Sequence, residues 1–424
     1  MIKTKLNRLN IDIYEEELSN KLKIYIVKNE NKNGIYVTFN TKYGSNINEF
    51  VPIGEEKFIK VPDGVAHFLE HKVFEQEDGV DPFSVFSENG SDCNANTSND
   101  KTTYLFSCTN YFEENLKLLL NYVTSPYFTD ENVLKEKGII EQEIKMYDDD
   151  PSTKLYERIL HNSFCKHNIR IPIGGTVKSI NKIDKEILYK CYNTFYHPSN
   201  MFIVITGNVD VEKTINLIKS FYNTKKYKDS EEIKIKKYNE PDNVYKEMDN
   251  LKFNVDIPKV SVNYKLNITN SNIDLYKKVM YLNILLNVKL SSTSLFLERL
   301  RKENIINEDL SYDIIYTDKH ALILIAVDSY NKDKVVSEIK TQMLDLSITK
   351  EELERKKKTL ISSLVYMSDN IYSINHKIVN NIIKYGDIIY NNYDLINSLN
   401  IDEYNDFINS LDFSNINITI IEPK

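Results

Sequence analysis

The chain passes twice through a similar order of strand and helix patterns, and this repeated order constrains its fold more than any other feature. In the first half, strand patterns cover 22–28, 35–40, 102–108 and 201–209, and helical patterns cover 65–74, 112–124, 130–147, 185–196 and 211–222. In the second half, strand patterns cover 260–266, 310–316, 321–327 and 416–421, and helical patterns cover 274–288, 294–303, 332–345, 349–367 and 373–385. We therefore predict an α+β protein made of two similar α/β domains.

The boundary between the two domains is predicted from a charged stretch. Between residues 224 and 248 the apolar periodicity fades and Lys, Glu and Asp dominate, as in an exposed linker. A chain of 424 residues also exceeds what one compact core usually holds. The predicted organisation is a first domain at 1–223, a charged linker at 224–248 and a second domain at 249–424.

Charge and hydropathy exclude two classes of partner. Lys and Arg number 54 against 62 Asp and Glu, and the resulting net charge of -8 disfavours binding to the phosphate backbone of nucleic acids. No apolar stretch reaches the roughly 18 residues of a membrane span, and acidic residues fill the place where a signal peptide would have its apolar core. We expect a cytoplasmic protein that binds neither nucleic acid nor membrane.

The most informative motif is His67-Phe68-Leu69-Glu70-His71. In a helix, residues at i, i+3 and i+4 share one face, so both imidazoles and the Glu70 carboxylate project together. Two imidazoles one turn apart form a bidentate clamp for zinc, and a carboxylate beside them can act as a base. The alternative is a pair of neighbouring histidines without a metal.

A catalytic zinc site usually has three protein ligands, so a third ligand is needed. Residues 130–150 offer Glu136 and Glu143, whose separation of seven places them on one face of a helix. Such a pair is often only a solvated helix face. Glu143, flanked by Ile140 and Ile144, suits a ligand better than Glu141.

At these residues the sequence resembles the pitrilysin and insulysin type of inverted zinc peptidases, the inverzincins. Within that family it is most similar to the roughly 420-residue bacterial members related to mitochondrial processing peptidase. The resemblance is carried by PDGVAHFLEHKVFE (62–75), NANTSNDKTTYLF (94–106), EKGIIEQEIKMYDDDP (136–151), IGGTVKSI (173–180) and FYHPSNMFIVITGNVD (195–210). It implies two α/β domains with antiparallel-rich sheets packed with helices, which together form half of a clam-shaped peptidase chamber.

The resemblance also implies roles for individual residues. One zinc ion per chain would be held by His67, His71 and Glu143, with Glu70 as the catalytic base and Glu136 supporting the site from behind the ligands. Asn94 and Ala95 would lie on an edge strand that takes the substrate backbone by strand addition. Their alternative is ordinary edge structure.

The second half lacks the motif, since 274–288 contains neither His nor Glu. In family members this half often supplies an Arg and a Tyr that grip the substrate carbonyl. The candidates here are Arg301, or Arg299, together with Tyr312. Their separation is longer than the usual one in the family, and an Arg-rich helix end followed by a strand tyrosine is the alternative.

The predicted function is that of a zinc metalloendopeptidase that hydrolyses short or unfolded peptides, with a possible role in processing or peptide maturation. Zinc would activate a water molecule and Glu70 would take its proton. The rival function is a non-catalytic scaffold or core subunit of the same fold. A family chamber needs four α/β units, so we expect a dimer, with a heterodimer containing a motif-less paralogue favoured over a homodimer.

Overall fold

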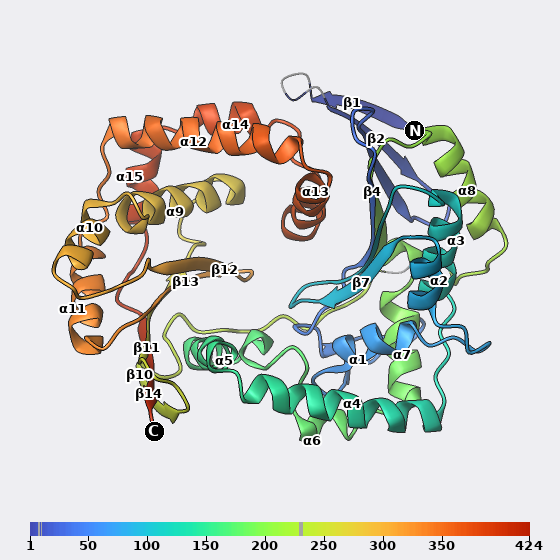
Figure 1. Cartoon of the computed structure of the whole chain (residues 1–424), viewed down its shortest axis with the longest axis horizontal. Helices are drawn as coiled ribbons and strands as arrows, with labels where there is room; N and C mark the ends of the chain where they lie inside the picture. The colour runs from blue at the N-terminus through green and yellow to red at the C-terminus, as the bar shows by residue number, and fades with distance from the viewer. Residues whose placement is uncertain (7–8, 10, 229–231) are drawn as a thin grey trace. The chain divides into compact units, whose positions relative to one another are not determined.

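A computed structural model of the 424-residue chain describes every residue except 7–8, 10 and 229–231 (Figure 1). Residues 229–231 belong to the predicted linker, so that part of the prediction lies outside the described residues. The chain forms two compact units, each built from three segments. Unit 1 comprises Met1–Ile144, Pro172–Lys237 and Leu364–Tyr390, and unit 2 comprises Lys145–Ile171, Tyr238–Ser363 and Asn391–Lys424.

Unit 1 is built around a mixed sheet. Its strands, in spatial order, are β1 (Ile2–Leu6), β2 (Ile11–Glu17), β3 (Lys23–Lys28), β9 (Met201–Gly207), β4 (Ile35–Thr41), β8 (Thr102–Cys108) and β7 (Asp92–Thr97). Only β3 and β9 run parallel among these neighbours. A small separate hairpin pairs β5 (Glu49–Phe50) with β6 (Ile59–Lys60).

The central strands of unit 1 are buried on both faces, which explains why β9 reads as an unbroken apolar run. Ile203 and Ile205 enter one core, whereas Phe202 and Val204 enter the other, as the period of two along a strand requires. Most helices of the unit serve the first core: α1 (Val65–Val73), α2 (Pro82–Glu88), α3 (Phe112–Val123), α7 (Lys185–Phe195) and α8 (Val211–Asn223). The second core is closed by α13 (Ile371–Tyr385).

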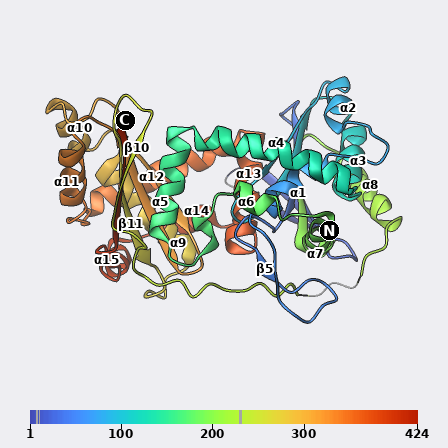
Figure 2. The same cartoon turned by 90° about the horizontal axis from the view of Figure 1, so that it is seen from below.

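Unit 2 contains the second sheet. Its strands, in spatial order, are β10 (Met248–Phe253), β14 (Ile416–Pro423), β11 (Lys259–Asn267), β13 (His320–Asp328) and β12 (Ser311–Tyr316). Helix α5 (Pro151–Ser163) packs on β14 and β11 (Figure 2). The remaining helices are α9 (Leu275–Leu290), α10 (Leu295–Lys302), α11 (Lys332–Gln342), α14 (Asn392–Ser398), α15 (Ile401–Asn409) and most of α12 (Lys350–Ser368).

The two sheets share one topology. In unit 1 the order β3-β9-β4-β8-β7 begins with a parallel pair and continues with antiparallel pairs. In unit 2 the order β10-β14-β11-β13-β12 does the same. The predicted fold class, two similar α/β domains with antiparallel-rich sheets, is therefore confirmed.

The units differ from the predicted domains of 1–223 and 249–424 in two segments. Residues 145–171, which carry α5, belong to unit 2, and residues 364–390, which carry α13, belong to unit 1. The cause is the apolar face of each helix. Ile159 of α5 packs with Leu322 and Leu324 of unit 2, whereas Ile378 of α13 packs with Phe202 and Val204 of unit 1. Each half of the chain thus supplies one helix to the sheet of the other half.

Most predicted strands and helices lie where the sequence patterns place them. The patterns missed the strands β1, β2, β5, β6, β7 and β10 and the helices α2, α5, α6 (Val177–Ile180), α14 and α15, although the family resemblance implied an edge strand at β7. Over the described residues, no helix combines the length and apolarity that a membrane crossing requires.

Candidate metal centre

Helix α1 carries the first part of the site. It begins after Gly64, whose backbone is left-handed at φ 94°. A Cβ at Gly64 would lie 2.5 Å from the Gly174 carbonyl oxygen, so a larger residue would displace this helix start. Phe68 and Leu69 are fully buried in the core of unit 1, and this packing directs His67, Glu70 and His71 to the opposite face.

Helix α4 (Asp130–Asp148) brings the second part of the site against α1. His67 Nε2 lies 3.6 Å from Glu143 Oε1, and His71 Nε2 lies 3.4 Å from Glu143 Oε2. The potential ligand atoms of the three residues all lie within 4.8 Å of one another. In the described part of the chain, this is the only group of His, Cys, Asp and Glu side chains that could hold a metal ion.

The donor spacing fits zinc. Atoms bound at about 2.0–2.2 Å to one tetrahedral ion lie about 3.3–3.6 Å apart. The two imidazole–carboxylate separations, 3.4 and 3.6 Å, fall in this range. Two nitrogen donors and one carboxylate oxygen are also the ligand chemistry of catalytic zinc sites. The residues present therefore fit the metal.

Glu136 lies behind His71. Its Oε1 is 3.0 Å from His71 Nδ1, so the carboxylate can fix the imidazole with Nε2 directed toward Glu143. Burial opposes the charged form of His71, but the hydrogen bond to Glu136 and the nearby carboxylates outweigh it and raise the pKa of His71.

A buried lysine, Lys72, joins the two helices. Its side chain is fully buried, forms an ion pair with Glu75, and places Nζ 3.4 Å from the Asn132 carbonyl oxygen and 3.9 Å from Glu136 Oε2. The cation therefore offsets the charge of Glu136 and attaches α1 to the first turn of α4. The sequence patterns did not single out Lys72, although a lysine on the core face of an amphipathic helix is a recognisable signal.

Glu70 does not join the metal group but contacts the edge strand β7. Thr97 Oγ1 donates a hydrogen bond of 2.5 Å to Glu70 Oε2. Thr97 lies in the segment 94–106 that carries the family resemblance, yet its contact with Glu70 was not predicted. The two residues are separated by 27 positions, and no local pattern connects a strand end with a helix so far away.

Asn94 and Ala95 lie on β7, which is the last strand of its sheet and pairs only with β8 among the described strands. Asn94 is exposed and Ala95 is half-buried. The Ala95 N–H donates to the Asn94 side-chain oxygen at 2.8 Å. Asn94 and Ala95 thus lie on an edge strand, while the addition of a substrate strand to that edge stays a prediction.

Arg299, Arg301 and Tyr312 belong to unit 2, whereas the His67–His71–Glu143 group belongs to unit 1. Arg299 binds Glu338 at 2.6 Å, and Arg301 forms an ion pair with Asp309. Tyr312 lies on β12, and burial raises the pKa of its hydroxyl. Both guanidinium groups thus have carboxylate partners within unit 2, and their contact with substrate stays a prediction.

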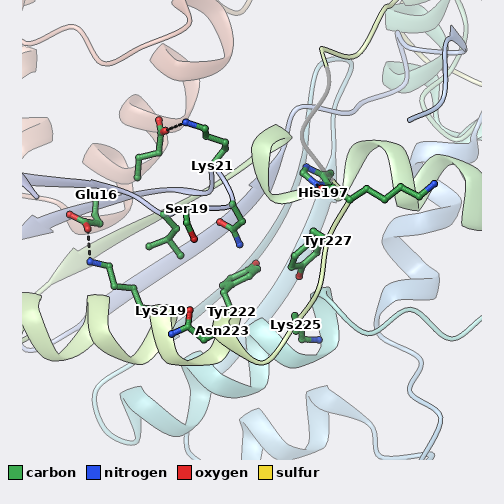
Figure 3. Close-up of a pocket in the computed structure, with 13 residues that line it drawn as sticks. Glu16, Ser19, Lys21, His197, Lys219, Tyr222, Asn223, Lys225 and Tyr227 are labelled. Atoms are coloured by element: carbon green, nitrogen blue, oxygen red, sulfur yellow. Dashed lines mark hydrogen bonds and ion pairs between the residues drawn. The ribbon is translucent and has the colours of Figure 1, made fainter. Parts of the chain in front are cut away.

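A polar cavity of about 690 Å³ lies elsewhere in unit 1 and is shown in Figure 3. Glu16 binds Lys219 at 2.5 Å and Glu17 binds Lys21 at 3.0 Å, so the carboxylates of the cavity already pair with two of its lysines. His197 caps the short helix Pro198–Asn200 by accepting a hydrogen bond from the Ser199 N–H. None of the lining residues belongs to the metal group.

Most of the chain is similar to family models and to known proteins. Residues 50–177 match the family model described as Insulinase (Peptidase family M16), and residues 182–360 match the model described as Peptidase M16 inactive domain. The uncharacterized zinc protease YmfH of Bacillus subtilis is 41% identical over 356 residues, which cover 83% of this chain and 83% of that protein.

Solved structures with the same fold include a putative M16-like peptidase from Alicyclobacillus acidocaldarius. It is 28% identical, with a TM-score of 0.92, and the match covers 98% of this chain and 99% of that chain. The periplasmic protease PqqL of Escherichia coli is 16% identical, with a TM-score of 0.73. That match covers 100% of this chain but only 46% of PqqL, so the same fold fills about half of a longer chain.

Proposed function

Because the chain belongs to the M16 family of peptidases, we propose that it is a zinc-dependent endopeptidase that hydrolyses short or unfolded peptides. The observation that carries the proposal is the convergence of His67, His71 and Glu143, with the Glu70 carboxylate one residue away from His71. His71 and Glu143 are separated by 72 positions in the sequence and come from two helices, yet their side chains lie 3.4 Å apart, which supports a shared ligand role.

In the proposed hydrolysis of the peptide bond, the metal and the side chains have different roles. Zinc held by His67, His71 and Glu143 would polarise a water molecule and lower its pKa toward about 7. Glu70 would take the proton from the attacking water and later pass it to the leaving amine. Glu136 would keep His71 oriented through the Nδ1 hydrogen bond. No side-chain nucleophile, and hence no covalent intermediate, is required.

The open edge of β7 would hold the substrate. An extended peptide that pairs with Asn94 and Ala95 by backbone hydrogen bonds would be selected by its main chain more than by its side chains. Folded proteins would be poor substrates, because their strands already have partners. Comparing the cleavage of one protein in its folded and unfolded forms tests this expectation, and equal rates would contradict it.

Metal analysis tests the ligand assignment. Purified protein should contain about one zinc per chain, and a chelator should abolish peptide cleavage until zinc is restored. The variant His71→Ala should lose zinc. Protein without zinc whose activity survives chelation would contradict the proposal.

The role of Glu70 is tested separately. Glu70→Gln should retain zinc and lose turnover, because the amide cannot take the proton while the ligands remain. Glu77→Gln, which alters an exposed glutamate just beyond α1, is the matched control and should leave both properties unchanged. Loss of zinc from Glu70→Gln would show that Glu70 is a ligand and not the base.

A non-catalytic role is the second candidate. It is favoured by the match of residues 182–360 to the inactive-domain model and by α9, which contains neither His nor Glu. Those features lie after residue 181, whereas the three proposed ligands all fall within residues 50–177, which match the Insulinase model. Zinc-loaded protein that binds peptides without cleaving them, alone or with a partner, would favour the non-catalytic role.

We further propose that the working form is a dimer, and we favour a motif-less paralogue over a second copy as the partner. The match to about half of PqqL supports a functional assembly twice the length of this chain. An isolated chain that sizes as a weakly active monomer and gains activity from a co-expressed paralogue is the expected result. Full activity at high dilution would contradict any dimer, and a fully active homodimer would contradict the heterodimer.

A further inference from the structure

We propose that Thr97 is a positioning residue for Glu70 and aims this carboxylate at the attacking water. Thr97 is the last residue of β7, and its Oγ1 donates to Glu70 Oε2 at 2.5 Å. A hydrogen bond of this length to a carboxylate is a strong one. The proposal rests on the proposed function, because Glu70 acts as a base only if the chain is a peptidase.

The Thr97 hydroxyl is held in place by the sheet. Thr97 pairs with Thr102 of β8, and the turn between them is closed by the Ser98 N–H, which donates to the Lys101 carbonyl at 2.8 Å. Threonine is branched at Cβ, so its side chain has little rotamer freedom in a strand. The position of Oγ1 is therefore determined by the sheet and not by a flexible loop.

The direction of the Thr97 proton also follows from its neighbours. Thr102 Oγ1 lies 3.2 Å from Thr97 Oγ1, but it donates its own proton to the Tyr43 carbonyl at 3.0 Å. A carboxylate only accepts, so the proton in the 2.5 Å contact between Thr97 and Glu70 comes from Thr97. With Oε2 occupied by this bond, Oε1 is the oxygen that Glu70 would present to the water.

This arrangement couples the base to the substrate strand. Ala95 and Thr97 are two residues apart on β7 and share one face of the strand. A peptide added to the open edge of β7 would therefore be aligned with the same strand that orients Glu70. Strand β7 would then determine both the register of the bound peptide and the orientation of the Glu70 carboxylate.

The substitution Thr97→Val tests the proposal, because valine keeps the branched shape and removes only the hydroxyl. We expect kcat on an unstructured peptide to fall about 10- to 100-fold, with KM within about twofold of the wild-type value and zinc content unchanged. Thr97→Ser should restore most of the activity. The matched control is Thr103→Val, which removes a buried hydroxyl that binds the Asn40 side chain at 2.8 Å; its kcat should stay within about threefold.

A second measurement needs no activity. In metal-free protein, the free energies of unfolding of the wild type, Thr97→Val, Glu70→Ala and the double variant form a double-mutant cycle. Coupled, non-additive effects are expected if the hydrogen bond exists in solution, and additive effects would overturn the proposal. An unchanged kcat in Thr97→Val, a loss confined to KM, or a failure of Thr97→Ser to restore activity would also overturn it. A wild-type protein without zinc-dependent cleavage would instead refute the proposed function, and the cycle would still test the Thr97–Glu70 bond.

Discussion

Helix α13 comes from the second half of the chain but belongs to unit 1, and α5 comes from the first half but belongs to unit 2. A core mutation in either helix should therefore destabilise the unit whose sheet the helix covers. Ile378 on α13 is 3% exposed and packs against the sheet of unit 1. Ile378→Ala removes three carbon groups worth roughly 0.8 kcal/mol each, or about 2.4 kcal/mol before the remaining cavity is counted. With the cavity term, the expected loss in free energy of unfolding is about 2–5 kcal/mol.

Hydrogen exchange measured by mass spectrometry can locate this loss. The strands β4 and β9 lie in the sheet under α13. Where their amide hydrogens exchange through opening of unit 1, the exchange rate should rise about tenfold for each 1.4 kcal/mol lost from the free energy of opening. Exchange in β11 and β13 of unit 2 should change much less. The matched variant is Ile159→Ala on α5, which is 2% exposed and should give the opposite pattern.

Two outcomes would refute this reasoning. Faster exchange in β11 and β13 after Ile378→Ala would mean that residues 364–390 belong with the rest of the second half, as the sequence boundary predicted. Equal acceleration in all four strands would mean that the two units open as one cooperative body. Either result would contradict the explanation that each compact unit is held together by its own core.

Three further predictions follow from individual contacts. Glu136→Gln should weaken zinc binding about 10- to 100-fold in a chelator competition, because it loses the charged hydrogen bond to His71, and an unchanged affinity would contradict that role. Burial lowers the pKa of His167 to about 4, so the unfolded chain takes up a proton below pH 6.5 that the folded chain resists. Stability should therefore fall by up to about 3 kcal/mol between pH 6.5 and pH 4, and His167→Asn, which can still cap the Ile169 N–H, should flatten that slope in urea titrations. Lys265→Met should cost about 3–5 kcal/mol in free energy of unfolding by leaving Glu240 buried without its ammonium partner, and adding Glu240→Gln should recover part of the loss unless the pair contributes nothing.

The part of the site that could be predicted from the sequence is the part that one helix contains. His67, Glu70 and His71 lie within one turn and a half of α1, so helix geometry alone puts them on the same face. The same rule placed Glu136 and Glu143 on one face of α4. Packing between helices decided that this face meets α1. It also decided that Glu143 faces both imidazoles and that Glu136 lies behind His71. The family resemblance supplied these roles, and residue spacing alone could not.

The positions of the strands along the chain were predictable for a related reason. The apolar run 201–205 and the alternating apolar residues of 260–266 are strand patterns that can be read from the sequence. The order in which these strands pair does not show, since β9 inserts between β3 and β4 from about 160 residues away.

The sequence by itself thus determined which residues could bind zinc, which segments form strands and helices, and that the chain holds two similar sheets. Only the tertiary structure decided which sheet each helix covers and which group orients Glu70. Helix α5 and α13 have apolar faces that either sheet could accept, and Thr97 is one of several threonines near the strand ends. Periodicity shows which face of a helix is buried, because residues three or four positions apart in the sequence lie on the same face. The identity of the covering surface depends on residues far along the chain, and only packing in three dimensions selects it.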